Sequence, residues 1–226
     1  MQRLRLKFGR GAPIRFISHL DTLRSWERVF RRAGIPLEYT QGFTPHPRMA
    51  VAAPLAVGVI SNAEVMDIWL RKWLPPQSVL MMARRELPAG FTLYDTWSVP
   101  AGAPALQASV QSARYRCIAV HPLGIAAARD NVKAFMAAQK VMHTFMRGDE
   151  ERSVDIRPLV GSVMVDSNPD GGCVIEMQVS IGQTGSARPD HLLDLLGFML
   201  PAEEICRTEL SFGWPGEAKG GGTDSG

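Results

Sequence analysis

Two histidines and one aspartate are the residues of this sequence whose types best suit proton transfer. His19 and Asp21 lie two positions apart, and His46 follows within a stretch rich in glycine and proline. Imidazole titrates near neutral pH, so two of them beside a carboxylate could act as general acid and base. The alternative is that His19 is a core residue with satisfied hydrogen bonds. Neither HxxxH nor HExxH occurs, and the sequence therefore predicts no metal site.

Four arginines gather on one face of a helix predicted over residues 18–33. At about 100° per residue, they fall nearly opposite an apolar face that includes Leu23, Trp26 and Phe30, and His19 falls with these apolar residues. An arginine face binds phosphates, or is simply a solvated helix surface. Few acidic residues balance it, which favours phosphate binding. The candidate nucleic-acid-binding residues are Arg24, Arg28, Arg31, Arg32 and, in the next segment, Arg48.

Residues 41–48 are predicted to form a loop because they are rich in glycine and proline. Pro45 and Pro47 restrict the backbone on either side of His46. An aromatic ring, an imidazole and a guanidinium on a rigid loop could stack on a nucleobase and contact it. The alternative is an ordered connection whose aromatic ring fills the core. The candidate loop residues are Gln41, Gly42, Phe43, His46 and Arg48.

Asp155 and Arg157 fall two positions apart in a strand predicted over residues 153–160. Side chains alternate across a strand, so the two share one face. We expect a structural ion pair between them. The alternative is that they fix the neighbouring domain.

The three cysteines show no spacing that would hold a cluster. Cys117, Cys173 and Cys206 lie far apart, with no CxxC or CxxxCxxC motif, so we expect small core residues or free thiols. No phosphate-cradling glycine loop, nucleophile elbow or dinucleotide fingerprint occurs either. The sequence therefore predicts no cofactor.

Charge is distributed unevenly along the 226 residues. Residues 1–50 hold ten Arg and Lys against three Asp and Glu, a net charge of +7, and residues 51–226 carry −4. This polarity suggests an anionic partner for the N-terminal part. An apolar content of 46% suffices for a core, yet no apolar run is long enough for a membrane span, and the charged N-terminus is unlike a signal peptide. We therefore expect a cytoplasmic protein without membrane contact.

Hydrophobic periodicity predicts the order strand, helix, two strands, helix, strand in the first half. The clearest elements are strands over residues 2–8, 63–70 and 91–99, and helices over 18–33 and 77–87, the first capped by Ser18 with Asp21. This order is that of a ferredoxin-like, or split βαβ, unit. The second half repeats it, with helices expected over 125–146 and 189–198 and strands over 113–120, 153–160, 162–166, 172–180 and 206–212.

The predicted fold class is therefore α+β, with two tandem ferredoxin-like subdomains and antiparallel sheets. We expect an N-terminal domain over residues 1–100 and a linker over 101–104, where proline, alanine and glycine predominate. A C-terminal domain over 105–214 and a disordered glycine-rich tail over 215–226 complete the expected organisation.

Four motifs occur close together in the N-terminal third: RFISHLD at residues 15–21, RAGIP at 32–36, TQGFTPHP at 40–47 and APLAVG at 53–58. A fifth, VDIRPLV, lies later at 154–160. Together they resemble an uncharacterised bacterial family, the radical SAM-linked domain of unknown function. Its members occur fused to radical SAM proteins or encoded beside them. The resemblance implies a radical SAM partner and no established activity. The cysteines of this chain do not form an iron–sulfur cluster motif, so the chain would be the partner of the radical enzyme and not the radical enzyme itself.

The basic N-terminal segment and this resemblance lead to one expectation about function. We expect a non-catalytic accessory protein that binds RNA, a radical SAM enzyme or both, and assists RNA modification. Two alternatives stay open. One is a metal-independent endoribonuclease that uses His19 or His46 with Asp21, and the other is an adaptor that binds only protein.

Overall fold

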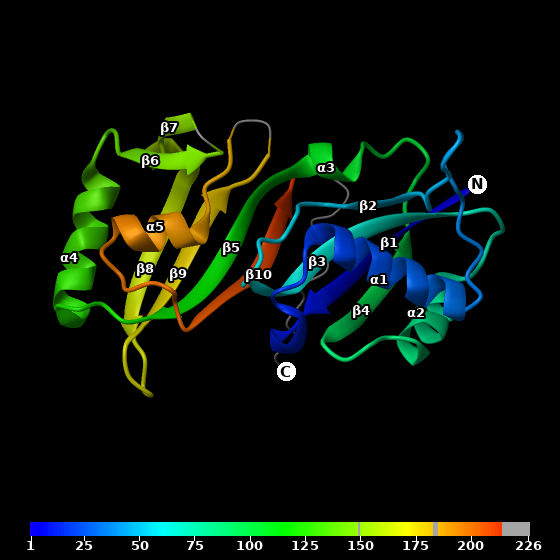
Figure 1. The fold of residues 1–226 in the computed structure, drawn as a ribbon, viewed down its shortest axis with the longest axis horizontal. Coiled ribbons are helices and arrows are strands. Elements are labelled where there is room, and N and C mark those ends of the chain that lie inside the picture. The colour runs from blue at the N-terminus through cyan, green and yellow to red at the C-terminus, as the bar shows by residue number, and fades with distance from the viewer. Residues whose placement is uncertain (149, 183–184, 214–226) are drawn as a thin grey trace, which may run out of the picture.

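An eight-stranded sheet runs along the molecule and belongs to both halves of the chain (Figure 1). The computed structural model describes residues 1–148, 150–182 and 185–213. In these ranges the strands pair antiparallel except at one junction. A separate two-stranded sheet consists of β6 (Met142–Arg147) and β7 (Glu150–Asp155). The fold is of the α+β class, as the sequence predicts.

The N-terminal half comprises β1 (Gln2–Arg10), the 3-10 turn η1 (Ala12–Ile14), α1 (His19–Arg32), β2 (Met49–Val51), β3 (Ile60–Leu70), α2 (Pro76–Arg85) and β4 (Phe91–Ser98). Its strands lie in the spatial order β4-β1-β3-β2. Along β1, Leu4, Leu6 and Phe8 alternate onto one face and are fully buried. They pack against the apolar sides of α1 and α2, so both helices cover the same face of this half.

The C-terminal half comprises α3 (Leu106–Ser109), β5 (Val110–Ala119), α4 (Gly124–Ala137), the β6–β7 hairpin, the 3-10 turn η2 (Arg157–Leu159), β8 (Val160–Ser167), β9 (Cys173–Ser180), α5 (Pro189–Leu195) and β10 (Glu204–Phe212). Its strands lie in the order β10-β5-β9-β8. If the β6–β7 hairpin is left out and the four strands of each half are numbered in sequence order, both halves have the same spatial order: fourth, first, third, second. The core of this half lies between the sheet and the helices α4 and α5.

The two halves join where β10 pairs in parallel with β3. The register places Cys206 opposite Ile60 and Arg207 opposite Ser61. Beside this pairing, the fully buried guanidinium of Arg207 binds the buried carboxylate of Glu64, with 2.9 Å from Nε to Oε1. A second nitrogen of Arg207 donates to the carbonyl oxygen of Ala53 (3.0 Å). A buried ion pair thus bridges the N- and C-terminal halves.

The segment predicted as a linker returns across the sheet face opposite the helices. Arg3 of β1 donates to the carbonyl oxygens of Ala103 (3.0 Å) and Pro104 (2.8 Å). Arg3 and Arg5 also both bind the buried carboxylate of Asp67 on β3. Residues 103–104 are therefore fastened to the N-terminal half by hydrogen bonds.

Two predicted elements of the C-terminal half are wrong in extent. The helix expected over residues 125–146 ends at Ala137, because residues 142–147 pair with β7 as a strand. The strand expected over 153–160 is interrupted by η2, since β7 ends at Asp155 and β8 begins at Val160. Local periodicity does not reveal the first change, because the pairing partner of residues 142–147 lies outside the segment. Pro158 is the local signal for the second, since proline favours the first turn of a helix. The expected tail lies outside the described residues.

No helix within residues 1–148, 150–182 and 185–213 is long and apolar enough to cross a membrane.

Candidate nucleic-acid interface

Helix α1 is fixed at its start by the predicted cap. The hydroxyl of Ser18 accepts from the backbone N–H of Asp21 (3.1 Å) and donates to the Asp21 carboxylate (2.7 Å). This hydrogen bond, with a smaller contribution from Arg24, lowers the pKa of Asp21. The carboxylate is therefore held by the Ser18 cap and by Arg24.

The inner face of α1 is anchored by an aromatic cluster. The Trp26 ring lies 5.0 Å from Phe8, 5.4 Å from Phe30 and 5.5 Å from Phe91, measured between ring centroids. Val29 is buried beside them, and Leu23 is half-buried at the edge. This anchoring fixes which face of α1 remains outside.

The outer face of α1 carries the predicted arginines, and all of them are exposed. Arg24 lies 3.6 Å from Asp21, and Arg28 donates to the Ser25 hydroxyl (3.0 Å). Arg31 and Arg32 have no side-chain partner among the described residues. From the first to the last, the row covers about 12 Å of helix. We call Arg24, Arg28, Arg31 and Arg32 the arginine row.

The loop after α1 is closed by hydrogen bonds at its base. The Thr40 N–H donates to the His46 carbonyl (2.8 Å), and the His46 N–H donates to the Thr40 hydroxyl (3.0 Å). Between them, Gly42 has φ +134°, a value that side-chain-bearing residues rarely adopt. Gln41 and His46 are exposed. Phe43 is exposed to 110% of its reference area, so its ring fills no core, contrary to the structural alternative.

Arg48, which the sequence groups with the arginine row as a candidate phosphate contact, is half-buried and has partners within the chain. Its guanidinium lies 3.3 Å from the Glu38 carboxylate and 4.8 Å from the centre of the Trp69 ring. It also donates to the sulfur of Met1 (3.4 Å). The other cation over Trp69 is Arg3, at 5.4 Å. Arg48 therefore fastens the loop to the sheet.

The structure does not bring His19 and His46 together. His19 opens α1, beside the end of β1, where Arg10 donates to the Ile17 carbonyl (3.2 Å). His46 lies in the loop that Arg48 ties to Met1, before β1 begins. The nine residues of β1 span about 30 Å. With Asp21 near His19 only, the three residues do not form one acid–base site.

Asp155 and Arg157 do not form the predicted side-chain ion pair. The Asp155 carboxylate accepts from the N–H groups of Val141 (2.9 Å) and Arg157 (3.2 Å). The Arg157 guanidinium donates instead to the carbonyls of Val160 (2.8 Å) and Met136 (3.0 Å). Because the strand ends at Asp155 and the chain turns at Ile156 into η2, each side chain ties a different segment near the base of the β6–β7 hairpin.

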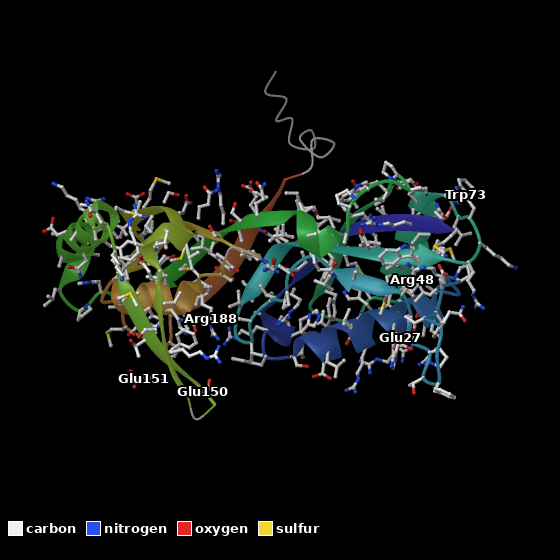
Figure 2. The ribbon with its side chains drawn as sticks, turned by 90° about the horizontal axis from the view of Figure 1, so that it is seen from above. Glu27, Arg48, Trp73, Glu150, Glu151 and Arg188 are labelled. Atoms are coloured by element: carbon white, nitrogen blue, oxygen red, sulfur yellow. The ribbon has the colours of Figure 1, made fainter. Side chains whose placement is uncertain are left out.

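Sequence reasoning missed a basic turn beside the loop. Arg71, Lys72 and Trp73 follow β3 directly and are all exposed. The Arg71 N–H donates to the carbonyl of Pro36 (2.9 Å), in the segment that leads into the loop. Trp73 and Arg48 lie at the same end of the molecule, and Glu27 of α1 marks the side with the arginine row (Figure 2). Two cations followed by tryptophan at a strand end are the signal that could have identified this turn.

The three cysteines are free thiols, two of them buried. Burial raises the pKa of the Cys117 thiol to about 12, and burial also raises the pKa of Cys173 and Cys206. The described residues contain no group of three His, Cys, Asp or Glu placed to hold a metal ion.

Comparison with protein families gives a match over most of the chain. The family described as "Uncharacterized protein conserved in bacteria (DUF2344)" matches residues 3–189. The chain belongs to this family. The DUF2344 match includes the arginine row, the loop and most of the C-terminal half. No protein of curated function matches the sequence.

Among solved structures, a chain in the "Crystal Structure of a Cbf5-Nop10-Gar1 Complex" is similar in fold. The TM-score is 0.50 at 11% sequence identity, and the likeness covers 92% of this chain. It covers 48% of the other chain, so this chain spans about half the length of that protein. At this identity, the likeness concerns the fold alone.

Proposed function

We propose that this protein is a non-catalytic accessory factor that binds RNA through the arginine row and assists RNA modification. The observation that carries the proposal is the pair Arg31 and Arg32. Both are exposed at the end of an ordered helix, and no described residue neutralises them. Guanidinium groups bind phosphate oxygens in a bidentate manner, which suits a row of this kind to a nucleic-acid backbone.

The distribution of charge along the chain also supports RNA binding by the N-terminal half. The net charge of +7 over residues 1–50 would draw a polyanion toward this half, while the rest of the chain carries −4. The loop follows α1 after the segment 33–40, and in this proposal the bound RNA passes from the row to Gln41, Phe43 and His46.

The resemblance to radical SAM-linked domains supports a radical SAM enzyme as the protein partner. In this proposal the chain holds the RNA and the partner performs the chemistry. We also propose that the halves are two ferredoxin-like units, because each places its four strands in the spatial order fourth, first, third, second.

A salt titration of RNA binding tests the proposal. The double variant Arg28→Ala with Arg31→Ala should bind RNA more weakly, and its affinity should depend less on salt. The logarithmic salt slope should become shallower by about 1.4, because each phosphate that an arginine neutralises on a single strand contributes about 0.7. Filter binding across a range of salt concentrations measures both quantities.

A matched control removes two arginines from another surface. Arg114 and Arg129 are exposed in the C-terminal half and paired with Glu209 (3.4 Å) and Asp166 (3.3 Å). The variant Arg114→Ala with Arg129→Ala makes the same change in net charge and should keep the wild-type slope. Equal losses in both variants, or no RNA binding by the wild type at low salt, would refute binding through the row.

An assay for cleavage of labelled RNA distinguishes the ribonuclease alternative from the proposed non-catalytic role. Cleavage by the wild type that is lost in His19→Ala would replace the proposal with an enzyme. The adaptor alternative predicts two results. The protein would bind no RNA, and a protein partner would still co-purify with it after nuclease treatment.

A further inference from the structure

Two large aromatic side chains at one end of the molecule are exposed to solvent. Phe43 is exposed to 110% and Trp73 to 70% of their reference areas. Phe8, Trp26 and Phe30 of this half are buried in the core, whereas Phe16 is exposed to 68% near the start of α1. In Figure 2, Trp73 extends from the end of the molecule beyond Arg48, on the side away from Glu27. We call Phe43 and Trp73 the aromatic pair.

Both members of the aromatic pair stand on fixed segments. The loop of Phe43 is closed by the two hydrogen bonds between Thr40 and His46. The turn of Trp73 is held by the Gln2 side chain, which accepts from the Leu74 N–H (2.9 Å) and donates to its carbonyl (2.8 Å). A ligand would meet segments whose backbone is already held, so little backbone entropy is lost on binding.

Exposed cations precede each member of the aromatic pair in sequence. Arg31 and Arg32 end α1 just before the loop, and Arg71 and Lys72 precede Trp73 directly. The turn and the segment entering the loop are joined by the hydrogen bond from Arg71 to Pro36. Aromatic faces interleaved with cations are the combination by which proteins bind single-stranded nucleic acid, since bases stack while phosphates are neutralised.

The exposure of the two rings bears on whether the protein would bind double-stranded or unpaired RNA. In an A-form duplex the bases are stacked on each other, and a protein meets mainly backbone and 2′-hydroxyl groups. Unpaired bases present a free face to an aromatic ring. Resting on the proposed RNA binding, we infer that this protein takes single-stranded or looped RNA, and that unpaired bases stack on Phe43 and Trp73.

The experiment compares one short unstructured RNA with the same strand annealed to its complement. The aromatic variant, Phe43→Ala with Trp73→Ala, should bind the single strand at least roughly ten-fold more weakly, about 1.4 kcal/mol, and bind the duplex as the wild type does. The matched control, Leu123→Ala with Met199→Ala, removes two exposed apolar side chains from the C-terminal half and should change neither affinity. Thermal unfolding of both variants checks that the fold is retained.

A spectroscopic measurement reports stacking directly. Wild-type tryptophan emission should be quenched by the single strand, and Trp73→Phe should lose most of that quenching while keeping much of the affinity. The inference is overturned if the aromatic variant binds the single strand as tightly as the wild type. If that happens while the arginine-row variant still weakens binding, RNA binding stands and only the stacking is wrong. Absence of binding to either RNA would refute the proposed function itself.

Discussion

At the scale of single residues, Arg48 and Arg31 have the same side chain but different surroundings. Arg31 is exposed and without a described partner, whereas Arg48 lies between Glu38 and the ring of Trp69. The sequence places both in one basic segment and cannot separate them, because Glu38 and Trp69 come from different parts of the chain. The loop residues Gln41, Phe43 and His46 are exposed as a binding loop requires, but no pattern indicates that His19 is far from them.

Substituting Arg48 should affect stability, and substituting Arg31 should not. Arg48→Ala removes a half-exposed ion pair and a cation–π contact, and we expect a loss of about 1–2 kcal/mol. Arg31→Ala should stay within about 0.5 kcal/mol of the wild type, as surface changes usually do. Urea unfolding of the two variants measures the difference. The reverse ranking would contradict the anchoring role of Arg48.

At the scale of elements, the β6–β7 hairpin meets α5 through aromatic rings. The His143 ring lies 4.4 Å from that of His191 and 5.8 Å from that of Phe145, between centroids. His143 is buried, and no described group bonds its Nε2 atom. Burial lowers the pKa of His191, and His143 and Arg188 act in the same direction, while Asp190 and Asp194 oppose them. The contact therefore favours uncharged imidazole.

This contact predicts a loss of stability in acid. Because the pKa of His191 is lower in the folded than in the unfolded protein, the imidazole is uncharged in both states well above about pH 6.5. As the pH falls through this value, the unfolded protein binds the proton more readily, so stability falls. His191→Phe keeps a ring but removes the titration. The melting temperature of the wild type relative to His191→Phe should therefore fall between pH 8 and pH 5. A difference that stays constant over this range would exclude the coupling.

Local pattern predicts the elements of the first half well and those of the second less well. The cap at Ser18, the apolar side of α1 and the strand β1 follow from short-range periodicity. The hairpin does not, because residues 142–147 suit a helix locally and become a strand only through pairing with β7. The pairing of β10 with β3 joins residues far apart in sequence, so no local signal announces it.

At the scale of the whole molecule, the Arg207–Glu64 pair holds the two halves together. Both side chains are fully buried, and Tyr115 and Arg10 lie within electrostatic reach. Glu64→Gln would leave a buried cation without its counter-charge, and we expect a loss of about 3–5 kcal/mol.

The exposed pair Arg114–Glu209, on the neighbouring strands β5 and β10, provides the comparison. Glu209→Gln should cost at most about 1 kcal/mol, because solvent screens that pair. Urea unfolding measures both losses, and calorimetry should resolve two transitions in Glu64→Gln where the wild type unfolds in one. Equal losses in the two variants would show that the buried pair does not couple the halves.

The central position of β10 has a consequence for how the protein is made. The Arg207 side chain reaches a partner 143 residues earlier in the chain. At about 5–20 residues per second, a ribosome needs roughly 7–30 s to add that length. During this interval the nascent N-terminal half carries Glu64 without its arginine and leaves part of the β3 edge open to other strands. Slow translation of the second half should therefore favour aggregation, and a chaperone would be needed most just before β10 emerges.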